Sequence, residues 1–464
     1  MKNNSVDHEL NRIIDLFSER SKIYLNSVEN RNVFPTPDAL TNLRKLDNGL
    51  QDSPVSSAKV FDELDTFGSP ATVTTCGSRY FGFVIGGSVP AALGANLMAG
   101  VWDQNAGLEI ASPVSSYLED VCRKWLISLL NLPPETQAGF VTGATMANFT
   151  ALAAARHSLL EKSGWNVEED GLFGAPPFTV IIGEEAHVSL LKAISLLGLG
   201  RNRVVRVPCD NQGRMRVDLF PEISGPTLVC IQAGNVNTGS FDPADVLCDM
   251  AHRKNAWVHV DGAFGLWANV SSERKYLTRG LEKADSWATD AHKWLNVPYD
   301  SGIAFVKDSK SLTASMSQNA AYLIQTGSRD PYIYVPELSR RARGVEIWAA
   351  LHSMGRNGLA DLINRNCDLA EAFADQLKSA GFQILNDVVL NQVLVSFGDH
   401  ALTNRIIKRI QEDGTCWCGG TIWQNQTAMR ISVSSWRTTR DDIDKSAAAM
   451  IRIAREEIVK QNSR

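Results

Sequence analysis

The sequence predicts an α/β protein with a mostly parallel central sheet, a helical N-terminal segment and a smaller C-terminal α+β domain. From about residue 76 to residue 310, short β-rich runs alternate with helical stretches, which is typical of βαβ units. The chain has 464 residues, enough for two or three domains, and 44% of them are hydrophobic. Both observations favour a globular protein with a sizeable core.

The first 75 residues are predicted to be helical. Apolar residues recur at helical spacing over 6–28, the sequence FPTPDA then interrupts the pattern, and a second helix is expected to start near Pro37. This segment, 1–75, is too short and amphipathic to stand alone. We therefore expect it to pack against another domain or a second subunit.

Residues 76–350 are predicted to form the large domain. Helical spacing marks helices over 148–160 and 188–197 between the apolar runs. The expected strands share a short apolar run bounded by turn residues, and they cover 139–142, 179–183, 204–207, 228–232, 257–261 and 302–307.

Residues 351–464 are predicted to form the smaller domain. A long helical region runs from about residue 345 through residue 380, and a final amphipathic helix is expected over 439–460. Alternating patterns between them predict strands over 393–397 and 429–433. The mixture indicates an α+β arrangement.

Composition excludes several classes of partner. Charged residues make up 21% of the chain and the formal net charge is −5, so neither nucleic acid nor an anionic membrane is expected. The first residues are polar and acidic where a signal peptide would be basic and then apolar, and no apolar run approaches 18 residues, so we expect a cytoplasmic protein. The eight cysteines are expected to be reduced, and Cys416 and Cys418 lack the partners of a zinc site, so no metal is expected.

The sequence WVHVDGAFG at 257–265 reads as a buried strand that ends in Asp261. Ligands of open α/β sheets bind beyond the carboxyl ends of strands, so Asp261 is placed where a ligand would bind. Asp261 could instead cap the following helix, a common use of aspartate.

Lys293 lies between His292 and Trp294 in the sequence DAHKWLNVPYDSG. Burial among such neighbours disfavours the charged form of a lysine, as an imine-forming amine requires. Lys293 stands 32 positions after Asp261. The pair matches the needs of pyridoxal phosphate, which takes a lysine for its aldehyde and an acid facing its pyridine nitrogen.

Two further segments join a strand to a helix at the same edge. GFVTGATMANF contains Thr145, whose hydroxyl and neighbouring amides could hold a phosphate at the helix start, although an ordinary capped connection would look alike. GEEAHVSLLKA contains His187, which could stack on a cofactor ring or could be a packed or capping histidine.

With these residues, the chain resembles the group II pyridoxal-phosphate-dependent decarboxylases, the family of aromatic-L-amino-acid, histidine, glutamate and 2,4-diaminobutyrate decarboxylases. The resemblance covers nearly the whole chain, and its most specific part is the HVDGAFG and DAHKW pair. It implies fold type I, the aspartate-aminotransferase-like fold with a seven-stranded sheet, in a homodimer with shared active sites. The matching segments, in order, are ASPVSSYLEDVCRKWL, VTGATMANFTALAAAR, EEAHVSLLKA, GNVNTGSFDPA, HVDGAFG, DAHKWLNVPYDSG and RRARGVEIWAAL.

The resemblance also implies a role for each site residue. Lys293 would form the internal aldimine with pyridoxal 5'-phosphate, and Asp261 would pair with the pyridine nitrogen. An L-amino acid would then lose carbon dioxide through a quinonoid carbanion. The other residues that the resemblance implies would surround the cofactor: His187 and Ala263 on its two faces, Ala144 and Thr145 at the phosphate, and Asn148, Asn237 and His292 completing the pocket.

Relatives also carry a loop tyrosine that protonates the carbanion. Tyr322, 29 residues after Lys293, fits that role. Relatives with phenylalanine there tend towards aldehyde-forming oxidative deamination, so Tyr322 favours plain decarboxylation.

The segment GSRYFGFVIGGSVP at 77–90 departs from the histidine-proline pair and aromatic cluster of the animal enzymes. The substrate of any one relative is therefore not transferred. The apolar residues Phe81, Phe83, Val84 and Ile85 favour an apolar or aromatic amino acid, whereas Arg79 could pair with an acidic one.

Three alternatives to this activity remain. Another fold-type I enzyme, either an aminotransferase or an aldehyde-forming oxidative decarboxylase, would need the same lysine and aspartate. Arg430 could grip a substrate carboxylate as aminotransferases do. A binding protein that has lost catalysis is the third alternative, and the complete set of Lys293, Asp261, His187 and Tyr322 argues against it.

Overall fold

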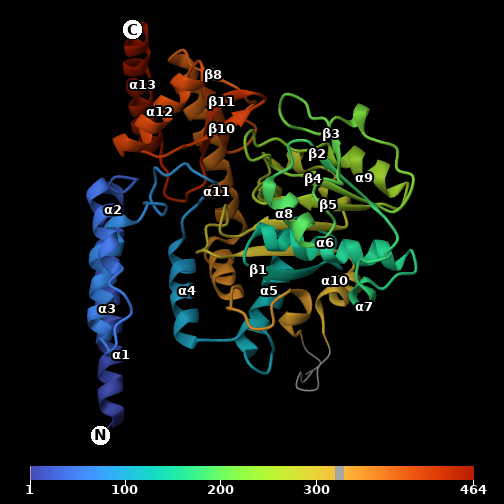
Figure 1. The fold of residues 1–464 in the computed structure, drawn as a ribbon, viewed down its shortest axis with the longest axis horizontal. Coiled ribbons are helices and arrows are strands. Elements are labelled where there is room, and N and C mark those ends of the chain that lie inside the picture. Colours follow the sequence, from blue (N-terminus) through green and yellow to red (C-terminus); the bar gives the residue numbers. More distant parts are fainter. Residues whose placement is uncertain (1, 319–328, 464) are drawn as a thin grey trace.

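The computed structural model describes residues 2–318 and 329–463. Within these residues the chain forms a seven-stranded sheet, a four-stranded sheet and a helical N-terminal segment that stands to one side (Figure 1). The α/β class predicted from the sequence, with its small second sheet, is confirmed.

The large sheet, as far as the chain is described, has the strand order β1-β7-β6-β5-β4-β2-β3. Only β7 is antiparallel to its neighbours, and the other pairs are parallel. The sheet is therefore mostly parallel, as predicted. Its strands are β1 (Gln137–Val141), β2 (Thr179–Gly183), β3 (Val205–Val207), β4 (Thr227–Gln232), β5 (Trp257–Asp261), β6 (Ser286–Asp290) and β7 (Gly302–Val306).

Helices cover both faces of this sheet. Successive side chains of a strand point to opposite faces. Accordingly, Val229 and Ile231 of β4 pack in one hydrophobic cluster, whereas Leu228 and Cys230 pack in another. The first cluster includes α5 (Pro113–Leu129) and α9 (Ala244–His252), and the second includes α6 (Ala144–Glu161), α8 (Val188–Leu196) and α10 (Ser309–Met316). A short helix, α7 (Val167–Asp170), contacts α6.

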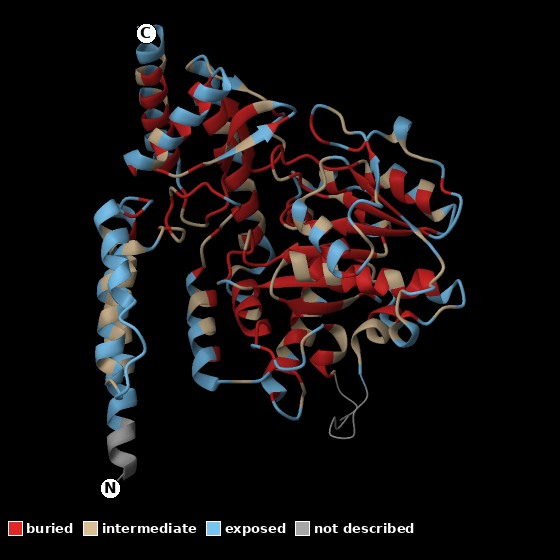
Figure 2. Cartoon of the chain, viewed as in Figure 1, coloured by how far each residue is buried: buried red, intermediate tan, exposed pale blue. Residues whose placement is uncertain are grey.

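The N-terminal segment is mostly exposed (Figure 2). The helix predicted over 6–28 is confirmed within the longer α1, and the second helix starts at Pro37 as predicted. Its N-cap is Thr36, whose hydroxyl oxygen accepts a hydrogen bond from the backbone N–H of Ala39. The helices of this part and the next are α1 (Lys2–Ser27), α2 (Pro37–Leu43), α3 (Ser57–Glu63) and α4 (Pro90–Trp102).

A second, antiparallel sheet follows the long helix α11. That helix bends sharply at Gly355, whose φ of 60° is left-handed. The strand order in the small sheet is β10-β11-β9-β8. Its elements are α11 (Gly344–Ser379), β8 (Gln383–Ile384), β9 (Gln392–Ser396), α12 (His400–Asp413), β10 (Gly419–Trp423), β11 (Gln426–Ser432) and α13 (Arg440–Asn462).

The strands predicted from apolar runs are found, within a few residues of the expected positions. β6, β8 and β10 were not predicted. β6 has the sequence SWATD and is nonetheless buried along its whole length. Its hydroxyl and carboxylate side chains do not form the apolar run that predicts a buried strand. They are nonetheless buried because their hydrogen-bond partners come from other parts of the fold.

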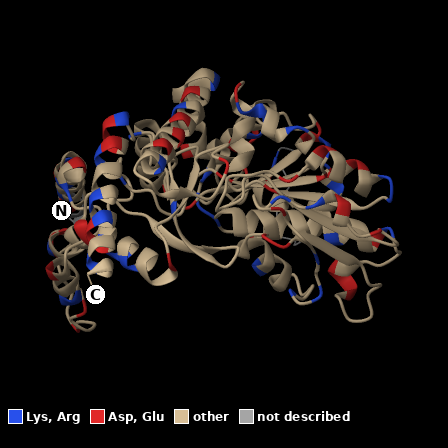
Figure 3. Cartoon of the chain, turned by 90° about the horizontal axis from the view of Figure 1, so that it is seen from above, with Lys and Arg blue, Asp and Glu red and all other residues tan. Residues whose placement is uncertain are grey.

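None of the described helices is long and apolar enough to cross a membrane. Basic and acidic residues are intermixed along the outer helices (Figure 3). All eight cysteines are free, and the described residues contain no group of three His, Cys, Asp or Glu residues that could hold a metal ion.

Candidate active site

Two neighbouring strands end in aspartates at one edge of the large sheet. β5 ends at Asp261, and its parallel neighbour β6 ends at Asp290. The N-termini of α6, at Ala144, and of α8, at Val188, follow β1 and β2 at the same edge. The carboxyl ends of parallel strands form the usual ligand site of such sheets.

Lys293 extends from the loop that follows β6. Its Nζ lies 3.1 Å from Oδ2 of Asp290 and 5.9 Å from the ring centroid of Phe264. Its side chain is 16% exposed. The lysine is enclosed, as expected, and its ion pair with Asp290 was not predicted from the sequence.

Asp261 is buried and accepts two hydrogen bonds. Its Oδ2 accepts from Nδ2 of Asn148 at 3.2 Å, and its Oδ1 accepts from the backbone N–H of Ala263 at 3.3 Å. Burial raises the pKa of Asp261, and the nearby His187 and Lys293 act in the opposite direction. The carboxylate is thus held in place by these two hydrogen bonds.

His187 is the N-cap of α8. Its Nδ1 accepts from the backbone N–H of Ser189 at 3.2 Å and lies 2.7 Å from that serine's hydroxyl. Burial lowers the pKa of His187, so its ring favours the neutral form. His187 and Asp261 line the same small cavity, which brings the predicted stacking residue to the predicted acid.

The N-terminus of α6 forms a tight turn against β7. A Cβ on Gly302 would lie 2.4 Å from Cα of Gly143, so the two backbones can approach this closely only because residue 302 is glycine. The backbone N–H of Ala144 donates to Oδ1 of Asp290 at 2.5 Å. The next residue, Thr145, is half-buried. A carboxylate of the protein itself therefore contacts the amide predicted to hold a phosphate.

His292 is held on the other side of Asp290. Its Nδ1 accepts from the backbone N–H of Ser301 at 3.0 Å, its Nε2 lies 3.4 Å from Oδ1 of Asp290, and its ring stacks on Tyr299 at 4.2 Å. Burial lowers the pKa of His292. The His292 ring is thus held by these contacts, favours its neutral form and lies beside Lys293.

Asn148 and Asn237, both predicted to complete the pocket, have different surroundings. The amide of Asn148 is occupied at both ends, by Asp261 and by His259. The Oδ1 of Asn237 accepts from the hydroxyl of Thr421 in β10, at 3.1 Å, so Asn237 connects the large sheet to the small one. Tyr322 lies outside the described residues.

Aromatic rings gather around the segment 79–86. Tyr80 stacks on Trp417 at 5.1 Å, and Phe83 lies 5.5 Å from the same indole. Arg430 of β11 interacts electrostatically with Tyr80 and with His187. Among the described residues Arg430 has no ion pair or hydrogen bond, and burial lowers its pKa.

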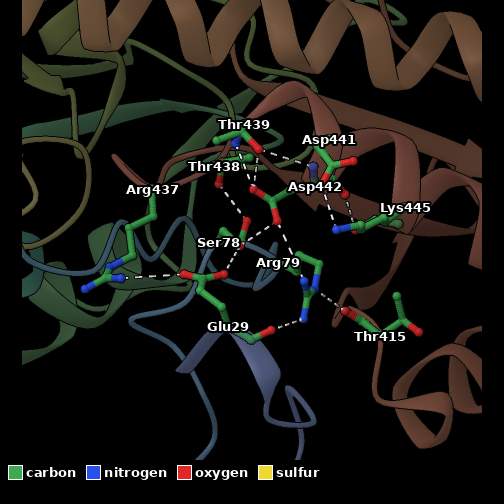
Figure 4. Close-up of polar contacts among 11 residues, drawn as sticks. Glu29, Ser78, Arg79, Thr415, Arg437, Thr438, Thr439, Asp441, Asp442 and Lys445 are labelled. Atoms are coloured by element: carbon green, nitrogen blue, oxygen red, sulfur yellow. Dashed lines mark hydrogen bonds and ion pairs between the residues drawn. The ribbon is translucent and has the colours of Figure 1, made fainter. Parts of the chain in front are cut away.

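Three residues expected near the substrate lie elsewhere. Phe81 packs edge-on against Phe373 in the small domain's core, and Val84 is buried in the main core. Arg79 donates to the backbone oxygens of Glu29 and Thr415 within a polar junction (Figure 4). The segment is irregular, so no periodicity in the sequence indicates which way its side chains point.

Asp290 and His259 were missed as site residues. Both lie in strands, and a polar residue inside a strand gives no sign of its partners. One signal was available for Asp290, because it precedes Lys293 by three residues at the end of a run that leads to the ligand edge.

Several known proteins are similar to this chain. Tryptophan decarboxylase 1 of Oryza sativa subsp. japonica is 26% identical over 92% of this chain and 89% of its own length. An aspartate 1-decarboxylase of Aliivibrio fischeri is 33% identical over 52% of this chain and 46% of its own length. The crystal structure of Oryza sativa TDC with PLP and tryptamine has a TM-score of 0.87 at 22% identity and covers 98% of both chains. Mouse CSAD has the same TM-score and identity and covers 97% of this chain.

The fold is therefore that of the fold-type I pyridoxal-phosphate enzymes. Asp261 at the end of β5 and Lys293 in the loop after β6 are the residue types that this cofactor requires. A model of the pyridoxal-dependent decarboxylase conserved domain matches residues 39–398. The chain belongs to this family: it is a pyridoxal 5'-phosphate-dependent amino acid decarboxylase, a carboxy-lyase.

Proposed function

We propose that this decarboxylase converts an apolar or aromatic L-amino acid to its amine and carbon dioxide, with Lys293 as the residue that binds the cofactor's aldehyde. The observation that carries the proposal is the meeting of Lys293, Asp261 and His187 at one sheet edge. When bound, pyridoxal phosphate supplies the electron sink for the bond that breaks.

The residues present fit the cofactor. Asp261 is a fixed, buried carboxylate that can pair with a protonated pyridine nitrogen, and the neutral ring of His187 lies in the same cavity. A phosphate would take the amides of Ala144 and Thr145 at the start of α6, where the helix dipole favours an anion. Ala263 would contact the ring face opposite His187.

The remaining pocket residues orient the substrate and exclude water. His292 is rigid and lies beside Asp290, the ion-pair partner of Lys293, so its ring can direct the substrate amine towards the lysine. Asn148 acts through Asp261, and Asn237 holds β10 against the large sheet. We assign to Tyr322 the delivery of a proton to the substrate carbon after carbon dioxide has left.

The aromatic rings support the apolar substrate class. Tyr80 and Trp417 are stacked, and Phe83 is 58% exposed although it lies close to the same indole. Such surfaces favour a flat apolar side chain.

Acidic amino acids are a second candidate class, and Arg430 is the observation that favours them. Its half-buried guanidinium has no ionic partner among the described residues, and a second substrate carboxylate would provide one. If the acidic class is correct, replacing Arg430 with Leu should abolish activity on aspartate or glutamate, and unchanged activity on both would exclude this class.

A homodimer in the cytoplasm is also part of the proposal. The helices α1, α3 and α4 expose large apolar side chains, which a second copy could cover. They are Leu10, Ile14, Ile23, Val60, Leu97, Met98, Val101 and Trp102.

Sedimentation velocity tests the dimer. Val101→Glu should yield a monomer because it places a charge on a covered apolar face, whereas Val459→Glu, at a similarly exposed position on α13, should leave the dimer intact. Identical sedimentation of both variants would exclude this face as the interface.

The activity is tested by incubating the protein and pyridoxal phosphate with the twenty standard amino acids, ornithine and 2,4-diaminobutyrate. Carbon dioxide, amine and peroxide are followed together. Amine that matches carbon dioxide, without peroxide or a keto acid acceptor, is the expected result. Peroxide and aldehyde would instead indicate oxidative decarboxylation.

A further inference from the structure

We infer that His259 and Asn148 are positioning residues, which hold Asp261 as an oriented carboxylate through a buried hydrogen-bond chain that begins at Trp257. The inference rests on the proposed pairing of Asp261 with the cofactor's pyridine nitrogen. It assigns a role in the reaction to one residue of β5 and one of α6, although neither is placed against the substrate.

The chain of contacts is continuous. Nε1 of Trp257 donates to Oγ of Ser286 at 2.9 Å, and that hydroxyl lies 2.9 Å from Nδ1 of His259. Nε2 of His259 lies 2.8 Å from Oδ1 of Asn148, whose Nδ2 donates to Oδ2 of Asp261 at 3.2 Å.

The fold explains the alignment of these residues. Trp257, His259 and Asp261 are alternate residues of β5, so their side chains point to one face of the sheet. Ser286 is the register partner of His259 in β6, and Asn148 comes from α6, which packs on these strands. Two neighbouring strands and one helix therefore supply all the residues of this hydrogen-bond chain.

The direction of the hydrogen bonds follows from the chemistry of the two ends. An indole N–H can only donate, so Ser286 Oγ accepts it and directs its own proton to Nδ1 of His259. A neutral imidazole then donates from Nε2 to Asn148 Oδ1, which leaves the amide N–H facing Asp261.

The opposite direction would require a protonated Asp261. In that arrangement Oγ of Ser286 would accept hydrogen bonds from both Trp257 and His259. The hydroxyl proton of Ser286 would then have no acceptor among the described residues. A buried donor without an acceptor is costly. Trp257 therefore fixes a direction that favours the ionised carboxylate.

Burial makes this effect strong and keeps the histidine neutral. His259, Ser286 and Asn148 have no exposed surface. Burial lowers the pKa of His259 to about 3, so the ring carries no charge that would compete for Asp261. Burial also raises the pKa of Asp261, and the N–H of Asn148 opposes that rise.

The test compares pyridoxal phosphate with its 1-deaza analogue, in which a carbon replaces the pyridine nitrogen. His259→Leu leaves Asn148 without its donor, and Trp257→Phe removes the indole N–H while it keeps a smaller aromatic ring at that position. Thr150→Val is the matched control, because Thr150 is a buried residue of α6 whose hydroxyl bonds only to the backbone oxygen of Met146.

The His259→Leu and Trp257→Phe variants should bind pyridoxal phosphate about tenfold more weakly and bind the deaza analogue as the wild type does, because Asn148 is no longer held with its N–H towards the charged carboxylate. Affinities come from fluorescence titration of the apo-protein. Equal weakening for both compounds would show a purely structural role and overturn the inference, as would unchanged affinity for both.

Histidine-selective ¹⁵N NMR of the apo-protein adds a readout that does not involve the cofactor. His259, identified by its absence in the Leu variant, should show a neutral ring protonated on Nε2, and protonation on Nδ1 would overturn the inference. If the proposed function fails instead, wild-type protein will gain no visible absorbance with pyridoxal phosphate that depends on Lys293.

Discussion

Asp290 contacts two groups, the N–H of Ala144 and the ammonium of Lys293, at the place where a phosphate is proposed to bind. Its carboxylate accepts the N–H of Ala144 and pairs with Lys293 at the same time. A phosphate at the start of α6 must share or displace this carboxylate, and two anions at one helix N-terminus repel each other. The residue therefore weakens anion binding at the place where the cofactor's phosphate is proposed to lie.

Asp290→Asn should strengthen the binding of inorganic phosphate to the apo-protein by about tenfold, because one negative charge is removed beside a dianion. Calorimetric titration measures this affinity. Asp399→Asn is a matched control, since Asp399 accepts the N–H of Leu402 at the start of α12, far from the site in sequence. Weaker phosphate binding in Asp290→Asn would show that the carboxylate supports the anion.

Part of the candidate site could be predicted residue by residue. Asp261, His187 and Lys293 each follow a strand, and their order along the chain was enough to bring them to one edge. His259 could not be predicted, because its importance lies in a partner from α6 that is more than a hundred residues away. Asp290 could have been noticed from its place before Lys293, but its contact with α6 could not.

Among the elements, prediction succeeded where the strand was apolar. β4 and β5 read as strands because their apolar runs are buried by helices on both faces. β6 has a polar sequence whose hydrogen-bonding groups are satisfied inside the fold: Ser286 by Trp257 and His259, and Asp290 by Ala144 and Lys293. A single sequence does not contain that pairing.

The contact between β7 and the start of α6 gives a stability prediction. Gly302→Ala should lower the free energy of unfolding by about 1–3 kcal/mol, because the new methyl group overlaps the backbone of Gly143. Urea denaturation measures the change. Gly225→Ala, where nothing lies within 4 Å, should change stability by less than about 0.5 kcal/mol.

The last helix has a capping box that supports a tertiary contact. Thr439 accepts from the N–H of Asp442, whose carboxylate in turn accepts from Thr439 and from the hydroxyl of Ser78. Thr439→Ala should cost about 1 kcal/mol of unfolding free energy, as loss of an N-cap usually does. Thr36→Ala, at the cap of the exposed helix α2, should cost less in the same denaturation experiment because α2 has no buried residues.

For the whole molecule, His259 predicts a loss of stability in acid. Its pKa is lowered to about 3 in the fold, whereas an unfolded histidine titrates near 6.5. Below about pH 6.5 the unfolded chain therefore binds a proton that the folded chain does not, and stability falls by up to about 1.4 kcal/mol per pH unit.

Urea denaturation at fixed protein concentration, at pH 7 and pH 5, measures this effect. His259→Gln should reduce the stability difference between the two pH values by about 2 kcal/mol, because glutamine does not titrate. The same difference in wild type and variant would mean that the histidine is protonated in the fold.

The polar junction of Figure 4 joins the beginning and the end of the chain. Glu29, Ser78 and Arg79 meet Arg437 and Asp442, which belong to the last thirty residues. During synthesis, this junction can close only after the residues at the start of α13 have been made. The large sheet can form first. Its edge with Asp261 and Asp290 can therefore be complete before the polar junction of Figure 4 forms.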